Sequence, residues 1–485
     1  MPSVVAHWNR SRWPHVQAVE YTSDDQNLLS NTMNRSSILF GGLALILGVL
    51  ALLPAPLHAQ QRVITFNEAV DIALERNVAV RRAQNNLELQ GLTVTSEKAD
   101  FLPNVNLNSG LNRNYGLFID NTTFEQRTTR TDGFNMSASS GLNLFNGFSD
   151  VASLRAAEAA LEGQEYSFER TKQTVVFDVI QAYLNVILAE ENIRIRQDDM
   201  DAQRESLEQI REFVNVGTRP VSDLYQQEAT LASSEAQLLT AENTFELNKT
   251  RLIRVLQLDP LGEYTFEAPR ADDVDTTPRL YEAETMLRTA FELRPDLRSQ
   301  EMSIESAAQS VRVAKSSRYP TLSASGSVST SWSSARREIF SFGDQLDLNR
   351  SERIGLSLSI PLFNRLNTRT NIERSQVQFR NAQLDLENAQ QNVALEVRQS
   401  YQDYLTATKR LDVTAKQLRS AEQALQIVQE RYNLADATLV ELTQAQAAFT
   451  QAASQRAQAV FEFHFQERVL AYYQGTLNPE RALFE

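Results

Sequence analysis

Hydrophobic positions along the chain follow two periods in a fixed order. From Phe66 to about Ala99 apolar residues recur at helical spacing, which predicts a helix that ends before Pro103. The period then becomes two, in a run that starts at Val105 and in a second run that ends at Leu144, which predicts two strands of about ten residues. Apolar residues at every seventh position follow, and they predict two helices of roughly 60 and 40 residues packed as a coiled coil.

The same order recurs about 217–218 residues further along the chain. Phe101-Leu102-Pro103 matches Arg318-Tyr319-Pro320, and Leu144-Phe145-Asn146 matches Leu362-Phe363-Asn364. A repeat of this length indicates one structural unit that is used twice. The predicted segments are a first repeat at 60–261, a linker at 262–280 and a second repeat at 281–485.

Polar segments separate the predicted elements. We expect exposed loops between the strands of each half, at 112–133 and at 331–353. We expect two helical hairpins, whose tips are the turns at Gly217-Thr218-Arg219-Pro220 and Ala435-Asp436-Ala437-Thr438. In the second half the helix that precedes the strands is expected from about Ala283 to Lys315.

The N-terminal region has the sequence pattern of an export signal. An apolar run begins at Ile38, shortly after Met33-Asn34-Arg35, and ends near Leu53, ahead of Ala59. The run is short for a membrane span and is typical of a secretory signal peptide, with cleavage expected after Ala59. We expect Met33 to be the true start and residues 1–59 to be removed; an uncleaved N-terminal anchor is the alternative.

Composition narrows the possible chemistry. The chain has no cysteine, four histidines and a net charge of −14, which excludes zinc clusters, disulfides and thiol nucleophiles and argues against nucleic acid as a partner. His464 alone follows the predicted signal peptide, and it lies between Phe463 and Phe465 in a heptad region, as a packed core histidine would. No nucleophile–base or phosphate-loop pattern accompanies it. We expect no enzymatic activity, no cofactor and no bound metal.

The predicted strands are apolar on one face and small and polar on the other, as in the wall of an outer-membrane β-barrel with a wet lumen. Four strands are too few for a soluble β-sandwich of normal size and too few to close a membrane barrel. An open edge in lipid would leave backbone groups unpaired. The predicted fold class is therefore an α+β membrane protein, in which three chains contribute four strands each to a twelve-stranded barrel.

This ordered pattern resembles the TolC-like outer-membrane efflux protein family over nearly the whole mature chain. The motifs that carry the resemblance are Phe66-Asn67-Glu68-Ala69, Phe101-Leu102-Pro103, Leu144-Phe145-Asn146-Gly147-Phe148 and Val216-Gly217-Thr218-Arg219. It implies a homotrimer in the outer-membrane lipid, whose barrel continues as a coiled-coil tunnel of helices across the periplasm. It also implies an exit duct for tripartite efflux or type I secretion, which docks onto a periplasmic adaptor and an inner-membrane transporter.

The resemblance also implies a gate at the periplasmic tip. Asp223 matches the family's tip aspartate, Tyr432 matches the tyrosine that hydrogen-bonds it, and Glu441 falls on an acid that faces the lumen. The chain departs from the family at Gln444, where a second acid is expected, and at Ala437, where the latch arginine is expected. For each of these residues, a solvated helix-end charge or a helix cap is the alternative interpretation.

Arg219 is our candidate for a charged partner that replaces the latch arginine. The hairpin tips are the expected docking surface for the adaptor, at Val216, Gly217, Thr218, Ala435, Asp436 and Thr438. A periplasmic coiled-coil adaptor or scaffold of an envelope-spanning complex remains the alternative function, because it would share the export signal and the heptads. The strands favour the channel, since an adaptor does not need a continuous apolar face toward lipid.

Overall fold

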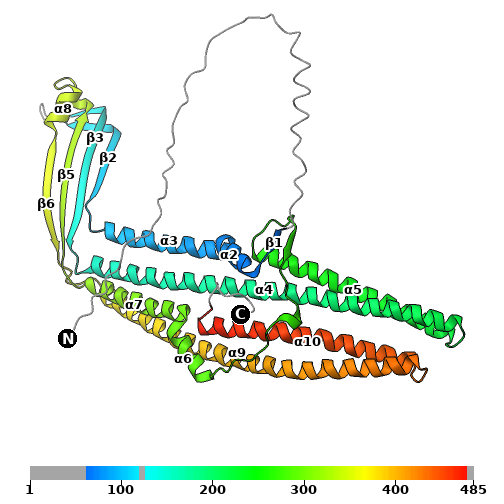
Figure 1. Cartoon of the computed structure of the whole chain (residues 1–485). Helices are drawn as coiled ribbons and strands as arrows, with labels where there is room; N and C mark the ends of the chain where they lie inside the picture. The colour runs from blue at the N-terminus through cyan, green and yellow to red at the C-terminus, as the bar shows by residue number, and fades with distance from the viewer. Residues whose placement is uncertain (1–61, 120–125, 478–485) are drawn as a thin grey trace, which may run out of the picture. The chain divides into compact units, whose positions relative to one another are not determined.

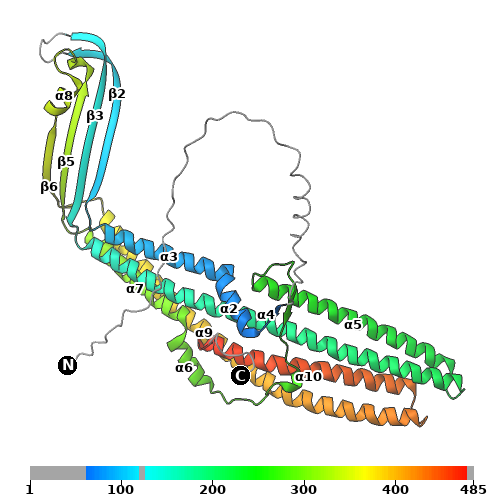
Figure 2. The same ribbon diagram turned by 45° about the horizontal axis from the view of Figure 1, so that its top comes forward.

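The computed structural model describes residues 62–119 and 126–477. The expected start at Met33 and the expected cleavage after Ala59 lie outside the described residues. The described residues form a four-stranded sheet, a small two-stranded sheet and a set of long helices, and they are drawn in Figure 1 and Figure 2.

The described residues of the first half form three strands and four helices. In chain order they are β1 (Arg62–Ile64), α2 (Phe66–Arg76), α3 (Val78–Ala99), β2 (Asn104–Ile119), β3 (Gln126–Phe145), α4 (Ser149–Asn215) and α5 (Val221–Val255). The long helix α4 has 67 residues and α5 has 35, close to the lengths that the heptads predict.

The second half repeats this order of elements. It runs through β4 (Tyr264–Phe266), α6 (Ala283–Leu293), α7 (Pro295–Ser316), β5 (Thr321–Ser333), α8 (Phe342–Leu348), β6 (Ser351–Ser359), α9 (Asn367–Asn433) and α10 (Leu439–Gln474), with short 3-10 turns at Ala271–Asp273 and Ser334–Arg336. The helix α8 lies between β5 and β6 and has no counterpart among the described residues of the first half.

The helix that precedes the strands is broken in each half, so the prediction of one continuous helix is wrong. In the first half Asn77 is extended, and its Oδ1 accepts a hydrogen bond from the Ala79 backbone N–H at 2.8 Å, which starts α3 as an N-cap. In the second half Arg294 is extended and Pro295 follows it. A residue before proline is disfavoured in the helical region, because the proline ring clashes with its backbone.

The loop expected at 112–133 is also wrong, because most of it is strand. β2 and β3 continue to Ile119 and Gln126, and Asn112 pairs with Gly133. This segment is polar, but its threonines suit a strand and Arg113 forms a cross-strand ion pair with Asp132 at 2.6 Å. The loop expected at 331–353 likewise contains α8, which begins with a capping box between Ser341 and Asp344.

The larger sheet has the order β2-β3-β5-β6, with every neighbouring pair antiparallel. The register gives its two faces opposite character, because successive side chains in a strand point to opposite faces. One row on the apolar face is Leu107, Ala138 and Val328, and the adjacent row on the other face is Asn106, Ser139 and Ser327. On the edge strand β6 the residues Ile354, Leu356 and Leu358 are exposed. The strands thus have the alternation that the sequence predicts, and an apolar face remains uncovered within the chain.

The helices form two antiparallel pairs, α4 with α5 and α9 with α10, as both views show. α4 also contacts α3, α7 and α10, so it joins the two halves. Their interior is apolar and includes Tyr183, whose hydroxyl donates to the backbone oxygens of Ile64 and Glu267 and so ties α4 to the small parallel sheet of β1 and β4. None of the described helices has a stretch long and apolar enough to cross a membrane.

Backbone torsions repeat together with the elements. Within the described residues φ is positive at eight positions, which form four pairs separated by 218 residues. The pairs are Gly147 with Arg365, Phe148 with Leu366, Gly217 with Ala435, and Gln257 with Gly475. The two halves therefore turn at equivalent places, although only one member of three pairs is a glycine.

Candidate functional site

The two hairpin tips form the turns that the sequence predicts. α4 ends at Asn215 and α5 begins at Val221, while α9 ends at Asn433 and α10 begins at Leu439. Each turn needs one residue with left-handed torsions, which is Gly217 with φ 75° in the first tip and Ala435 with φ 61° in the second. Thr218 closes the first turn, because its hydroxyl and its backbone N–H both donate to the Phe213 oxygen at 2.9 Å.

The two tips pack against each other through a small apolar core. Its buried members are Ile210, Tyr432, Ala437, Leu439 and Leu442. Ile210 comes from the first hairpin and the other four come from the second. This core explains why the two turns are held together even though more than 200 residues separate them in sequence.

Arg219 links the two tips by polar contacts as well. Its guanidinium lies over the Tyr432 ring, 4.3 Å from Cζ to the ring centroid. The same group donates hydrogen bonds from Nη2 to the backbone oxygens of Tyr432 at 2.9 Å and Ala437 at 3.4 Å. One arginine of the first hairpin thus binds the turn of the second hairpin, including the position where the family resemblance places the latch arginine.

Tyr432 and Asp223 are not hydrogen-bonded to each other within the chain. Tyr432 is 2% exposed, and its hydroxyl is buried without a hydrogen-bond partner among the described residues. Burial raises the pKa of Tyr432, and the Arg219 guanidinium opposes that rise. Asp223 lies in the first turn of α5, where its Oδ1 accepts from Ser222 at 3.4 Å. The expected hydrogen bond between Tyr432 and Asp223 is therefore absent, and no described group accepts the proton of the Tyr432 hydroxyl.

Glu441 caps a helix. Its Oε2 accepts from the Thr438 backbone N–H at 2.8 Å and from the Thr438 hydroxyl at 3.0 Å, while its own N–H donates to that hydroxyl at 3.2 Å. This capping box begins α10, and its hydrogen bonds lower the pKa of Glu441. Arg431 lies 3.9 Å from Glu441 and also binds Asp436. Gln444 is exposed one turn further along α10.

The expected docking residues are exposed at the tips, and one more belongs with them. Val216 is 72% exposed, and Leu434, at the equivalent place of the second turn, is 81% exposed. Sequence reasoning missed Leu434 and Arg431. The repeat offset that relates Gly217 to Ala435 would have identified Leu434 as the counterpart of Val216. Among the described residues there is no group of three or more His, Asp or Glu side chains placed to hold a metal ion.

Comparisons with known proteins agree with this architecture. The sequence model of the family described as outer membrane efflux protein matches residues 69–256 and 286–470. The chain is 22% identical over 374 residues to outer membrane protein TolC of Escherichia coli (strain K12), covering 74% of each chain. It is 23% identical over 387 residues to protein CyaE of Bordetella pertussis (strain Tohama I), covering 78% of this chain and 77% of that one.

Solved structures show the same fold. The CmeC outer membrane channel of Campylobacter jejuni is similar with a TM-score of 0.73 and 17% identity, covering 86% of this chain and 87% of that one. The outer membrane protein VceC of Vibrio cholerae is similar with a TM-score of 0.68 and 16% identity, covering 84% of this chain and 96% of that one. TolC and VceC are named as outer membrane proteins and CmeC as an outer membrane channel, and none of the four proteins is named as an enzyme.

Proposed function

The chain belongs to the outer membrane efflux protein family and is an outer-membrane protein, and from this premise we propose that it is the exit duct of a tripartite efflux or type I secretion system. It would pass small molecules or proteins from a periplasmic adaptor and an inner-membrane transporter to the exterior. The duct would be a homotrimer with a twelve-stranded barrel and a helical tunnel.

The observation that carries this proposal is the sheet. β2 and β6 are its edges, and each has one side without a strand partner among the described residues. One face is exposed and apolar, and the other carries serine and asparagine. Backbone groups at an open edge are costly in lipid, so β2 of one chain would pair with β6 of the next. Three chains would close the ring with the apolar face toward lipid and the polar face toward water.

Two substitutions at neighbouring positions of β6 test this facing. Leu356→Arg places a charge on the apolar face and should cost about 2–4 kcal/mol if that position lies near the middle of the bilayer. Ser357→Arg places the same charge on the polar face and should be tolerated. The yield of folded, membrane-inserted protein and its thermal stability in detergent would measure both. Equal tolerance of the two variants would contradict a lipid-facing apolar surface and would favour a periplasmic scaffold.

We propose further that Arg219 restricts the aperture at the tips, in place of an arginine at position 437. This assignment is supported by the contacts of Arg219 with Tyr432 and with the Ala437 backbone, which hold the second hairpin to the first. Arg219→Ala should raise single-channel conductance in planar bilayers. Arg211→Ala is the matched control, since Arg211 is an exposed arginine of the same hairpin that pairs with Glu208 on its own helix. Unchanged conductance of Arg219→Ala would exclude this role.

Glu441 and Gln444 are proposed to line the aperture, where three copies of Glu441 would favour cations. Because Glu441 also caps α10, the test must separate its charge from its hydrogen bonds. Glu441→Gln keeps a residue that suits a capping box and removes the charge. Reversal potentials in a salt gradient should move toward lower cation selectivity. An unaltered reversal potential with intact stability would leave Glu441 as a cap alone.

The adaptor is proposed to dock on the tips, around the exposed Val216 and Leu434. Val216→Asp combined with Leu434→Asp should abolish export in a strain that depends on this channel, while the trimer remains in the outer membrane. Val413→Asp is the control, because Val413 is an exposed valine on α9 away from the turn. Full export by the double variant would mean that the adaptor docks on another part of the protein.

A further inference from the structure

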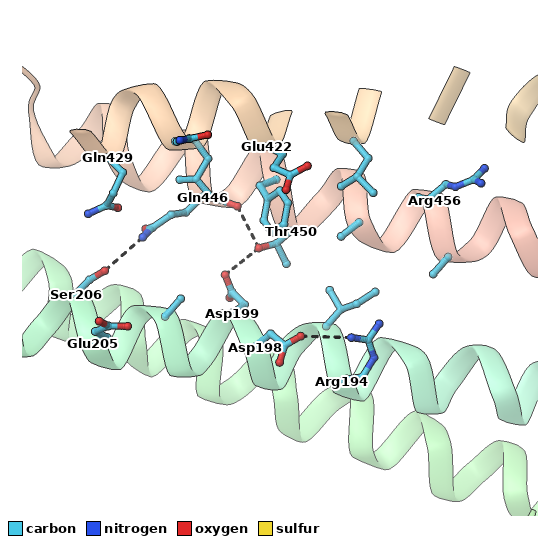
Figure 3. A pocket seen from close by; sticks show the side chains of 18 of the residues that line it. Arg194, Asp198, Asp199, Glu205, Ser206, Glu422, Gln429, Gln446, Thr450 and Arg456 are labelled. Carbon is cyan, nitrogen blue, oxygen red and sulfur yellow. Dashed lines mark hydrogen bonds and ion pairs between the residues drawn. The ribbon is translucent and has the colours of Figure 1, made fainter. Parts of the chain in front are cut away.

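Contacts within one chain join the two helical hairpins but do not complete the edges of the sheet. Figure 3 shows one contact between the hairpins, in which Gln446 on α10 donates to the Ser206 hydroxyl on α4 at 3.4 Å. The two edge strands of the sheet differ in length, since β2 has 16 residues and β6 has nine. When β6 pairs with β2 of the next chain, it leaves part of that strand without a partner. Proteins commonly cover such an edge with a helix or a loop.

Apolar residues continue along β2 beyond a charged pair. Arg113 lies on the apolar face and forms an ion pair with Asp132 on β3 at 2.6 Å. Three exposed apolar residues follow at alternate positions on the same face, and we call them the β2 patch: Tyr115, Leu117 and Ile119. Charges on the lipid face of a membrane barrel are tolerated near its interfaces. Arg113 therefore marks the end of the lipid-facing band, and the β2 patch lies beyond it, where lipid tails do not cover it.

The helix α8 packs on the same face of the sheet. The ring of Phe342 contacts those of Phe134 on β3 and Trp332 on β5, with centroids 5.9 and 5.7 Å apart. The Thr330 hydroxyl on β5 donates to the Leu346 backbone oxygen at 2.5 Å. By the strand register these three sheet residues lie on the apolar face. α8 is thus held outside the ring of strands and not in its lumen.

Side chains of α8 also complete the edge of β5 where β6 is too short to do so. β6 pairs with β5 only as far as Ser329. Beyond it, Asn349 Nδ2 donates to the Ser331 backbone oxygen at 2.6 Å, and the buried Gln345 accepts from the Ser333 backbone N–H at 3.0 Å. α8 therefore takes the place that a longer β6 would occupy, between β5 and the neighbouring chain.

The segment around α8 has an apolar surface that the described residues leave exposed. It consists of Ile339, Phe340 and Leu348, which we call the α8 patch. α8 directly precedes β6 in the chain. In a ring of chains it lies beside the β2 residues that follow those paired with β6, whatever the register. The ring therefore brings the α8 patch of one chain to the β2 patch of the next.

We propose that the α8 patch of each chain packs against the β2 patch of the next chain and closes the seam where β6 is too short. This inference rests on the proposed trimer and adds a partner for α8 to it. The contact is head to tail, so three identical copies of it complete the ring. Burial of both patches removes from water the apolar surface that lipid does not cover.

Cysteine cross-linking tests this contact in the full chain, which has no native cysteine. Leu348→Cys would be combined in turn with Tyr115→Cys, Leu117→Cys and Ile119→Cys, and the detergent-extracted protein treated with a short bismaleimide. At least one pair should give a covalent trimer on a denaturing gel. Leu348→Cys with Leu107→Cys is the control, because Leu107 is an exposed leucine on the same face of β2 before the charged pair.

The outcomes separate this proposal from the proposed function. A native mass near three chains with no cross-link in any of the three pairs would overturn the contact and leave the trimer standing. Cross-linking of the control pair to the same extent would also overturn it, because the contact would then not be confined to the far part of β2. A monomer would overturn both the contact and the trimer.

A second measurement asks whether the contact stabilises the trimer. Phe340→Ser with Leu348→Ser removes two apolar side chains of the α8 patch and should lower the temperature at which the extracted trimer dissociates. Leu280→Ser is the control, because Leu280 is an exposed leucine that belongs to neither the sheet nor the α8 patch. An unchanged dissociation temperature of the double variant would contradict a contribution from α8.

Discussion

Each half of the chain has a bend where the helix before the strands is broken, between α2 and α3 in the first half and between α6 and α7 in the second. The two bends have similar backbone geometry but different side chains. Asn77 and Arg294 stand at equivalent places, and their backbone torsions are close: φ −61° and ψ 130° against φ −68° and ψ 122°. Asn77 makes the bend with a neutral amide, whose Nδ2 donates to the Val255 oxygen at 3.1 Å. Arg294 makes it with a charge that is 3% exposed and is hydrogen-bonded to Asp296 and Glu396, each at 2.6 Å.

The difference shows that duplication preserved backbone geometry while side chains diverged. The charged bend at Arg294 is the more vulnerable of the two, because loss of either carboxylate partner leaves the buried guanidinium with less compensation. Burial alone would raise the pKa of Asp296, yet the hydrogen bonds from Arg294 hold that pKa below its usual value. Arg170, which lies 4.0 Å over the Tyr472 ring and 3.9 Å from Asp296, extends the cluster to α4.

The largest effect is expected at the charged bend. Arg294→Met keeps an unbranched apolar stem and removes the charge, which should cost about 2–3 kcal/mol because two partly exposed carboxylates lose a hydrogen-bonded partner. The thermal unfolding midpoint of the detergent-extracted protein would measure the loss. A variant as stable as the parent would mean that the cluster contributes nothing beyond packing.

A substitution at the neutral bend, at Asn77, should lower stability by a smaller amount. Asn77→Ala removes the N-cap of α3 and the hydrogen bond to the end of α5, at a cost of about 1 kcal/mol. The same unfolding measurement applies, with Asn85→Ala as a control at an exposed position within α3. A loss as large as that of Arg294→Met would remove the contrast between the two bends.

At the hairpin tips one substitution is expected to stabilise the protein. Ala435 occupies a left-handed conformation that Gly217 occupies in the first tip. Ala435→Gly relieves backbone strain of about 1–2 kcal/mol, partly offset by the greater freedom of glycine in the unfolded chain, so a gain of about 0.5–1 kcal/mol is expected. Gly217→Ala should destabilise by a similar amount, and a loss of stability in both variants would contradict the equivalence of the turns.

The last effect appears only on acidification and comes from one histidine of the second half. His464 is 5% exposed, and burial lowers its pKa to about 4. Because the unfolded chain binds the proton near pH 6.5 and the folded chain does not, stability should fall as the pH drops from about 6.5 toward 4, with a slope of up to about one proton. His464→Phe should flatten this slope. The equivalent residue of the first half is the exposed Glu246, for which Glu246→Gln serves as the control.

The features that the sequence predicted correctly are those that a local pattern of residues determines. The alternation gave the strands, the heptads gave the long helices, and glycine, proline and small polar residues gave both tip turns. The break at Asn77 was missed because an asparagine is a weak local signal for a helix end. The break at Arg294 could have been predicted, because Pro295 follows it. The lengths of β2 and β3 were underestimated, because polar residues on exposed strands resemble loop sequence, whereas β6 has close to the predicted ten residues. The repeat boundaries at 60–261 and 281–485 stay a prediction.

Less of the candidate site than of the fold could be predicted from the sequence. The contact of Arg219 with Tyr432 joins residues 213 positions apart and depends on tertiary packing, so no local pattern reveals it. The capping role of Glu441 was readable, because Thr438 and Glu441 have the spacing of a capping box. The contacts of α8 with the edge of β5 also depend on tertiary packing and are visible only in the structure.

The most direct test of the account is the native mass of the detergent-extracted protein, corrected for bound detergent. The account rests on a four-stranded sheet with two open edges, so it predicts a mass near three chains. A monodisperse, folded monomer in the outer membrane would contradict it, because one chain would then satisfy both edge strands without a partner.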